Sequence, residues 1–560
     1  MFKTTPSCFW GGLVLLTSVW LTGCASLPSD VQRPVSNALA ENSGTRLGSA
    51  VASRAAAATT RNDSGFALVG SAELAFTSRM ALIVAAEKTL DLQYYAIHAD
   101  DTTDRMFAAL REAAGRGVRV RILLDDFNTA GKDAQVLKLA FEKNIEMRLF
   151  NPLPSSRGSG LWRIVSSLSD AARLQRRMHN KIFVADNAVA ITGGRNLGDT
   201  YFGQSDGVNF VDIDVLAAGR MARDLSRSFD QYWNNPLAYP VQSLMTAKDI
   251  EALKPKPVAK TATSTENPLP VNEPPASQSN ANTPIEPYKT TVTRVAVDPA
   301  GLTTTIAALP DTTDLRLLSW TWAPSVMLVD KASKIAADAD AAEESNDTAV
   351  DGLLSLMSQA KTDLLVVSPY FVPGPEMMKQ FADIRQRGVR VRVLTNSLAS
   401  NDAVAAHAGY ARYREALIAM GVELYEMRSV RRGTVADFGS GSGSAGGSRG
   451  ASRASLHAKA VVVDNQLLVV GSMNLDLRSK LQNSEVGIAI RNRKLATEAT
   501  ALIEPGLTTG AYRVELANGQ LVWRAPAGSG LPDATSEPDA SMSLKLLVKL
   551  ISPFAPDEML

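Results

Sequence analysis

Two matching motifs, each built around a histidine, constrain this chain of 560 residues more than any other feature. The first motif comprises His179, Lys181, Asp186, Gly193 and Asn196. Each counterpart in the second motif stands 278 residues further along the chain, at His457, Lys459, Asp464, Gly471 and Asn474. A period far above the about 20 to 50 residues of a stacked repeat indicates that a whole domain is duplicated.

Predicted helices and strands recur in the same order in both halves. The first half has a helix at 72–87, a strand at 90–97, a helix at 103–115 and a strand at 118–124. The second half has a strand at 363–371, a helix at 376–386 and a strand at 388–394, where Gly-Val-Arg-Val-Arg-Val-Leu repeats Gly-Val-Arg-Val-Arg-Ile-Leu of 117–123 with one change. This alternation predicts an α/β fold with duplicated domains.

The residue types in the motifs suit chemistry on a phosphodiester. In each copy the histidine and lysine are two residues apart, ahead of an apolar strand at 182–184 or 460–463, which places them on one face. The glycine and asparagine follow a second apolar strand, at 188–191 or 467–470, where glycine lets the backbone approach a ligand. Two ammonium groups and two amides can bind non-bridging oxygens, while one imidazole attacks phosphorus and the other protonates the leaving oxygen.

The scarcity of cysteine and histidine narrows the chemistry. The two cysteines, Cys8 and Cys24, are too few for a disulfide scaffold or a cysteine-rich zinc site. We expect no metal and no other cofactor, because the two lysines supply the positive charge that Mg²⁺ would otherwise bring. The remaining two of the four histidines, His98 and His407, have no matching motif and are interpreted as ordinary polar residues. A formal charge of +1 gives no whole-chain sign of nucleic-acid binding.

The paired motifs resemble the two HKD motifs of the phospholipase D superfamily. Similarity to the bacterial cardiolipin synthases of this superfamily extends over 90–95, 117–126, 148–152, 177–181, 193–202 and 471–479. The resemblance implies two phospholipase D-type domains with mixed β-sheets flanked by helices. It also implies one active site at their pseudo-twofold interface, to which each domain contributes its histidine, lysine and asparagine.

The resemblance further assigns roles to residues around the motifs. In the family the motif aspartate is chiefly structural, which implies that Asp186 and Asp464 hold their strands. A carboxylate that follows the asparagine orients each histidine; this is Glu485 in the second copy, and in the first copy Asp212 is preferred to Asp214. The remaining phosphate-binding positions are expected at Gly193, Gly194, Gly471 and Ser472. Ser472 matches the family's hydroxyl donor, and Gly194 departs from it.

The implied reaction has two steps. His179 is assigned as the nucleophile that forms a phosphatidyl-histidine, and His457 as the acid and base. If the acceptor is phosphatidylglycerol the product is cardiolipin, and if it is water the enzyme is a phospholipase D that releases phosphatidic acid. An envelope nuclease and a non-enzymatic lipid-binding lipoprotein are weaker alternatives, because the chain is nearly neutral and both motifs keep their histidine and lysine. The expected partners are anionic phospholipids and the bacterial membrane, with no nucleic acid; a monomer with two motifs should suffice, and a helper protein stays open.

The N-terminus resembles that of a bacterial lipoprotein. An apolar run at 8–21 is shorter than the about 20 residues of a membrane-spanning helix, and it ends in Leu21-Thr22-Gly23-Cys24, which is similar to a lipobox. This predicts a signal peptide at 1–23, lipidation of Cys24 and a place in the bacterial envelope. Because Ala25 and Ser26 follow the cysteine, the resemblance to lipoproteins also implies sorting to the outer membrane, facing the periplasm. An uncleaved signal anchor and a plain secretory signal stay open.

Composition divides the rest of the chain. We expect a flexible tether at 24–65, the first domain at 66–250, a disordered linker at 251–300, the second domain at 301–530 and a tail at 531–560. In the tail, Leu544, Leu547, Val548 and Ile551 on one face and Lys545, Lys549 and Ser552 on another predict a basic amphipathic helix, which either lies on the membrane or packs on the protein. Arginines ahead of the motifs, including Arg177, Arg428 and Arg453, either bind anionic headgroups or form a solvated surface.

Overall fold

The computed structural model describes residues 27–60, 62–153, 171–245, 249, 294–297, 303–306, 312–336, 347–429, 453–552 and 557. The predicted signal peptide, Cys24 and most of the predicted linker at 251–300 lie outside these residues.

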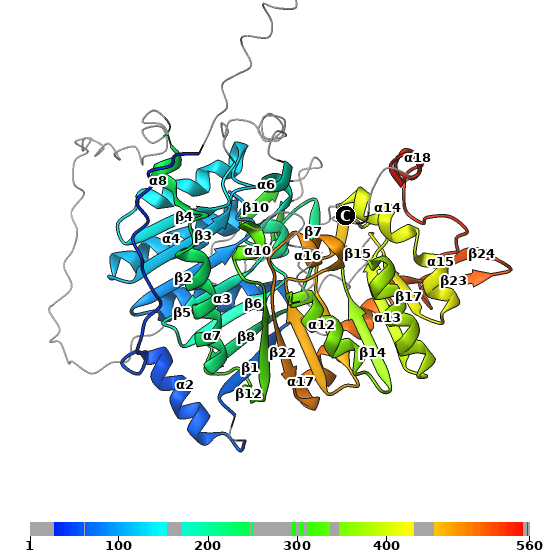
Figure 1. Ribbon diagram of the computed structural model, residues 1–560, viewed down its shortest axis with the longest axis horizontal. Helices are drawn as coiled ribbons and strands as arrows, with labels where there is room; N and C mark the ends of the chain where they lie inside the picture. The colour runs from blue at the N-terminus through cyan, green and yellow to red at the C-terminus, as the bar shows by residue number, and fades with distance from the viewer. Residues whose placement is uncertain are drawn as a thin grey trace, which may run out of the picture.

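The first half alternates strands and helices in the predicted order (Figure 1). Its elements are β1 (Ser64–Val69), α3 (Ala72–Ala85), β2 (Thr89–Tyr94), α4 (Asp101–Gly115), β3 (Arg119–Asp125), the 3-10 helix η1 (Gly131–Phe141), β4 (Ile145–Phe150), α6 (Ala171–Gln175), β5 (Ile182–Ala185), β6 (Val189–Gly193), the 3-10 turn η3 (Asp199–Tyr201), β7 (Val208–Val211), β8 (Asp214–Gly219), α7 (Arg220–Trp233), β9 (Ala238–Pro240) and α8 (Val241–Leu244). A hairpin of β10 (Arg294–Val297) and β11 (Thr303–Ile306) follows.

The second half repeats this order. Its elements are β12 (Thr321–Trp322), β13 (Ser325–Val329), α10 (Ser333–Ala336), α12 (Ala349–Ser358), β14 (Asp363–Val367), β15 (Phe371–Val372), α13 (Gly374–Gln386), β16 (Arg390–Asn396), α14 (Val404–Ala411), α15 (Arg414–Ala419), β17 (Glu423–Met427), β18 (Arg453–Leu456), β19 (Ala460–Val463), β20 (Leu467–Gly471), β21 (Leu475–Asp476), α16 (Leu477–Leu481), β22 (Val486–Arg491), α17 (Arg493–Thr508), β23 (Ala511–Ala517), β24 (Gln520–Arg524) and α18 (Met542–Ile551).

The described strands form two nine-stranded mixed sheets, in the orders β12-β1-β8-β6-β5-β2-β3-β4-β9 and β13-β22-β20-β19-β14-β16-β17-β23-β24. The run β2-β3-β4 is parallel, as is β14-β16-β17, and the motif strands β5 and β19 join these runs antiparallel. The two orders correspond strand for strand from β1 and β13 onward. The predicted α/β fold with duplicated domains is therefore confirmed.

One hydrophobic core joins the two halves. It contains Phe66 and Ile182 of the first half together with Val462 and Ile488 of the second. Helix α7 contacts β13 of the other half, and α17 contacts β1. Because β12 extends the first sheet and β13 begins the second, the sheets divide between residues 322 and 325, later than the predicted boundary at 300–301.

The described part of the predicted tether is not a free chain. Its helix α2 (Arg46–Ala57) is capped by the Thr45 hydroxyl, which accepts from the Gly48 amide. Ahead of this helix, the Ser36 carbonyl accepts a hydrogen bond from Arg121 (2.7 Å), and the Ala38 amide donates to Asp230 (2.7 Å). Figure 1 shows the segment running along the outer edge of the first domain. Polar side chains of the domain hold the start of this segment, and Leu47 of α2 packs into the first hydrophobic core.

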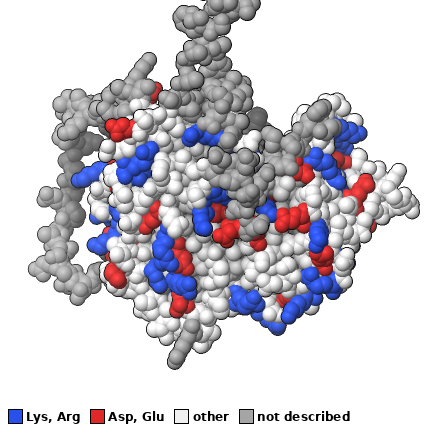
Figure 2. Space-filling model, viewed as in Figure 1, with Lys and Arg blue, Asp and Glu red and all other residues white. Residues whose placement is uncertain are grey.

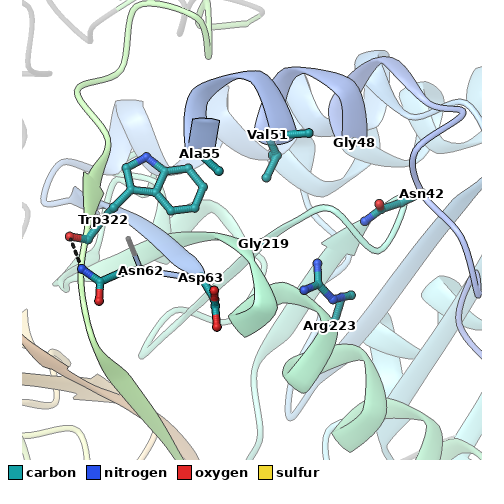
Figure 3. Close-up of a pocket in the computed structure, with 10 residues that line it drawn as sticks. Asn42, Gly48, Val51, Ala55, Asn62, Asp63, Gly219, Arg223 and Trp322 are labelled. Carbon is teal, nitrogen blue, oxygen red and sulfur yellow. Dashed lines mark hydrogen bonds between the residues drawn. The ribbon is translucent and has the colours of Figure 1, made fainter. Parts of the chain in front are cut away.

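A cavity of about 360 Å³ lies where α2 meets the edge of the first sheet (Figure 3). Val51, Ala55, Arg223 and Trp322 line it, and Asn62 donates to the Trp322 carbonyl at its rim. None of its lining residues belongs to the predicted catalytic set.

Candidate active site

Each motif histidine lies on a segment that pairs with the other half. Strand β18 pairs in parallel with β7, with Leu456 opposite Val211, and the His457 amide donates to the Val211 carbonyl (2.8 Å). Ahead of the first motif, Met178 bridges to Ser484, and the His179 amide donates to the Ser484 carbonyl (2.9 Å). This register brings His457 beside the residue after Val211 and His179 beside the residue after Ser484.

Those following residues are the two predicted carboxylates, and each contacts the histidine of the other half. His179 Nδ1 lies 3.0 Å from Glu485 Oε2, and His457 Nδ1 lies 2.7 Å from Asp212 Oδ2. The competing Asp214 instead pairs with Arg79 (2.9 Å). Both carboxylates are fully buried, so each fixes the orientation of one imidazole and leaves Nε2 available for chemistry.

The two lysines occupy equivalent places. Lys181 Nζ donates to the His179 carbonyl (2.7 Å), and Lys459 Nζ donates to the His457 carbonyl (2.5 Å). Burial lowers the pKa of Lys181 to about 7 and that of Lys459 to about 8. Two buried ammonium groups in one site attract an anionic phosphodiester, which would restore their full charge.

Burial also sets the charge of the imidazoles and their partners. It lowers the pKa of His179 well below its usual range, assisted by the charges of Lys181 and Lys459. It likewise lowers the pKa of His457 to about 4, although Asp212 partly opposes this. Burial raises the pKa of Glu485 to about 7. Burial also acts to raise the pKa of Asp212, but the hydrogen bond and charge of His457 outweigh it and lower that pKa overall.

The asparagines differ in their contacts. Asn196 Nδ2 donates to the Tyr201 hydroxyl (2.9 Å), and its Oδ1 accepts from the Ala96 amide (3.3 Å). Asn474 is buried, and its Oδ1 has no hydrogen-bond partner among the described residues. A buried amide with an unused polar atom at a catalytic site is suited to meeting a ligand.

The two halves hold their carboxylates differently. Ser472 and Ser479 both donate hydroxyl hydrogen bonds to Glu485. At the equivalent of Ser472, a Cβ added to Gly194 would lie 2.3 Å from Asp212 Oδ1. Gly194 therefore departs from the serine pattern because Asp212 occupies the space that a side chain would need. Gly193 and Gly471 are equally enclosed, since an added Cβ would lie 2.2 Å from Asp214 Oδ1 and 2.4 Å from the Val486 carbonyl oxygen.

The motif aspartates lie at the far ends of their strands. Asp186 turns β5 into β6 with a φ of 52°, and Asp464 turns β19 into β20 with a φ of 53°. Asp186 accepts from the amides of residues 87–89, and Asp464 from those of residues 361–363. Each carboxylate thus ties its hairpin to the start of the next strand in the sheet.

Aromatic walls around the imidazoles were not predicted. The Tyr95 ring stands edge-on to His179 with centroids 5.1 Å apart, and Tyr201 stands edge-on to His457 at 5.3 Å. Phe210 also contacts His457, at 4.9 Å. Tyr95 and Tyr201 both fall within the stretches of family similarity, and that was the available signal.

The other two histidines each pair with a carboxylate. His98 Nδ1 is 2.9 Å from Asp133, and buried His407 contacts Glu537. Arg177 is neither a headgroup ligand nor a solvated residue, because it forms a buried ion pair with Asp125 (2.8 Å). Arg428 lies over the ring of Tyr512, and Arg453 is exposed.

Charges of both signs are interspersed on the face shown in Figure 2. Within the described residues, no group of three or more His, Cys, Asp or Glu is placed to hold a metal ion. The described helices are all too short or too polar to cross a bilayer.

Comparison with known proteins identifies the family of the chain. A family model described as "Cardiolipin synthase, PLD-like domain" matches residues 80–233 and 353–505. Cardiolipin synthase C of Escherichia coli K12 is 35% identical over 425 residues, which cover 75% of this chain and 80% of that protein. An uncharacterised protein of Helicobacter pylori J99 is 31% identical, with 84% of this chain and 85% of that protein covered.

Among solved structures, phosphatidylserine synthase of Haemophilus influenzae Rd KW20 has the same fold, with a TM-score of 0.50 and 14% identity over 88% of this chain and 94% of that chain. The two regions that the family model matches include both motifs and the carboxylates exchanged between the halves. The chain therefore belongs to the phospholipase D superfamily, in its cardiolipin synthase-like family.

Proposed function

We propose that this chain is a phosphatidyltransferase that makes cardiolipin from phosphatidylglycerol and a second phospholipid. The observation that carries the proposal is the exchanged pairing, in which His179 and His457 each hold a buried carboxylate of the other half through Nδ1. Two oriented imidazoles with Nε2 available, beside two buried lysines, are what a two-step transfer at phosphorus requires. The relationship to cardiolipin synthase C supports the choice of phospholipid substrates.

In the first step, His179 Nε2 attacks phosphorus of the donor lipid and the bond to the headgroup oxygen breaks. His457 gives its proton to the departing alcohol, and a phosphatidyl-histidine remains. Lys181 and Lys459 neutralise the charge that develops on the non-bridging oxygens. The positive charges of Lys459 and Lys181 help to lower the pKa of His457. Binding of the anionic diester would offset these charges and raise that pKa toward the range in which His457 can carry this proton.

In the second step, neutral His457 removes a proton from the glycerol hydroxyl of a phosphatidylglycerol. The resulting oxygen attacks phosphorus, the bond to His179 breaks, and cardiolipin leaves. The carboxylates support this division of roles. Asp212, whose pKa is lowered by its hydrogen bond with His457 against the opposing effect of burial, stays ionised and stabilises an imidazolium. Glu485, to which Ser472 and Ser479 donate, accepts from Nδ1–H of neutral His179, so Nε2 keeps its lone pair and can attack phosphorus.

We further propose that Cys24 carries lipid and that the protein faces the periplasm on the outer membrane. The contacts of the N-terminal segment with the first domain would leave only a short connection between that domain and a lipid on Cys24. Arg33, whose guanidinium lies 4.2 Å from the Tyr239 ring centroid, is only nine residues beyond Cys24. Nine residues span at most about 30 Å when fully extended. Such an anchor would hold the first domain close to the bilayer.

The test is transfer by purified full-length protein in detergent micelles. Phosphatidylglycerol is supplied with and without phosphatidylethanolamine, and cardiolipin, phosphatidic acid, glycerol and ethanolamine are quantified by mass spectrometry. Cardiolipin with equimolar release of glycerol or ethanolamine is expected. Phosphatidic acid as the main product would contradict the proposal and show that the protein is a hydrolase. The control is Lys379→Ala, which removes an exposed lysine paired with Asp383 and should match the wild type.

A further inference from the structure

Helix α18 exposes apolar side chains away from the rest of the protein. Met542, Leu546, Leu547 and Leu550 are 78%, 59%, 43% and 61% exposed. We call these four residues the α18 stripe. Large apolar side chains gathered on one exposed helix face are unusual on a soluble protein and mark an interaction surface.

The other side of the helix is held against the protein. Leu544, Val548 and Ile551 are half-buried, and Ile551 packs with Tyr413 around the buried Val372. Helix α18 also contacts α14, and Ser541 caps its first turn by accepting from the Leu544 amide. The sequence spacing had placed Leu547 on the same face as Leu544, Val548 and Ile551, but the structure turns Leu547 outward. The α18 stripe is therefore a fixed surface, not a frayed end.

We propose that the α18 stripe docks on an anionic phospholipid bilayer. The helix carries Lys545 and Lys549 and contains no Asp or Glu, so its charge complements anionic headgroups. Ten residues of helix are about 15 Å long, and four side chains cannot supply the about 800 Å² per partner of a stable protein interface. A short, convex apolar ridge flanked by lysines is instead the form that inserts into the headgroup boundary of a membrane.

The position of the helix agrees with this partner. In Figure 1, α18 stands at the upper right, and the described N-terminal segment enters at the upper left near α8. The elements next to the histidines, α6, β7 and α16, lie between them in the upper part of the view. A bilayer along this side would lie beside α18 and beside the first described residues of the N-terminal segment, with the elements next to the histidines between them. This step rests on the proposed function, because it takes bilayer lipids as substrates.

The experiment measures binding of Cys24→Ser protein made without residues 1–23, which carries neither an acyl anchor nor the apolar run at 8–21, to sedimented vesicles. One set contains phosphatidylglycerol and phosphatidylcholine at a ratio of about 3:7, and the other contains phosphatidylcholine alone. Leu546→Asp/Leu550→Asp should reduce binding to the anionic vesicles tenfold or more, and Lys545→Glu/Lys549→Glu should remove the preference for them. The matched control is Leu317→Asp, which changes an 83% exposed leucine elsewhere and should bind like the parent.

Equal binding by the leucine variant and its parent would overturn the proposal. The proposal would also be overturned if sedimentation velocity showed that the parent forms a dimer and the leucine variant is a monomer. The α18 stripe would then bind a second copy of the chain. Binding is measured without turnover, so failure of the transferase assay leaves this result standing. If transfer occurs, the leucine variant should keep its rate in detergent micelles and lose it on vesicles.

Discussion

Gly194→Ala tests how the first half makes room for its carboxylate. The added Cβ would lie 2.3 and 2.6 Å from the two carboxylate oxygens of Asp212, far inside contact distance, so the carboxylate must move. The movement would break the 2.7 Å hydrogen bond to His457 Nδ1. A hydrogen bond to a charged group is worth about 1.5 to 3 kcal/mol. Each about 1.4 kcal/mol of transition-state stabilisation is tenfold in rate, so kcat should fall about 10- to 150-fold.

The matched variant is Ser472→Gly, which removes a hydroxyl donor to Glu485 and introduces no clash. Because Ser479 still donates to Glu485, the loss should lie at the low end of the about 1.5 to 3 kcal/mol of a hydrogen bond to a charged group, so kcat should fall about tenfold. Both variants are assayed for transfer in micelles, with circular dichroism and thermal unfolding as folding controls. If Gly194→Ala acts through Asp212, the double variant with Asp212→Asn should be no slower than Asp212→Asn alone. Wild-type turnover in Gly194→Ala, or additive losses in the double variant, would refute the reasoning.

Four further outcomes are expected. His179→Ala and His457→Ala should each abolish nearly all transfer while the protein still folds, and the double variant should be little worse, because the histidines act as a unit; one single variant with more than about a tenth of the wild-type rate would contradict a shared site. Transfer should survive EDTA, and inhibition reversed by one added metal ion would contradict this. Lys181→Met should abolish transfer yet raise the Tm at pH 6. Burial lowers the pKa of Lys181 to about 7, so the charged lysine destabilises the folded state at pH 6, and methionine removes that cost. The gain in Tm should shrink as pH rises from about 7 toward the ordinary lysine value of 10.5, and a lower Tm at pH 6 would be the contrary result. Cys24→Ser should take up no fatty-acid probe in cells yet keep its rate in detergent, whereas normal labelling would exclude lipidation at this residue.

The sequence alone carried the fold class and most of the site. Alternating strands and helices were visible locally, and the two motifs kept their spacing over 278 residues. What local patterns could not show was which carboxylate serves which histidine. Those pairs are 306 and 245 residues apart in the chain, and only the docking of the two halves brings them together.

The prediction of a flexible N-terminal tether was wrong for a related reason. Its composition is that of a linker, and a linker was predicted. Its order comes from Arg121, Arg148 and Asp230, whose side chains hydrogen-bond the segment only because the folded domain presents them at one edge. Arg177 was misread in the same way, since its partner Asp125 is 52 residues earlier in the chain.

The exchanged carboxylates also give the order of biosynthesis a chemical meaning. When the ribosome has completed the first motif, His179 still lacks Glu485, which lies 306 residues downstream. At about 5 to 20 residues per second, the partner is made roughly 15 to 60 seconds later. Until then no carboxylate is present to orient His179, and Asp212 has no imidazole from which to accept a hydrogen bond. On the proposed mechanism, the paired site exists only once both halves have been synthesised and docked.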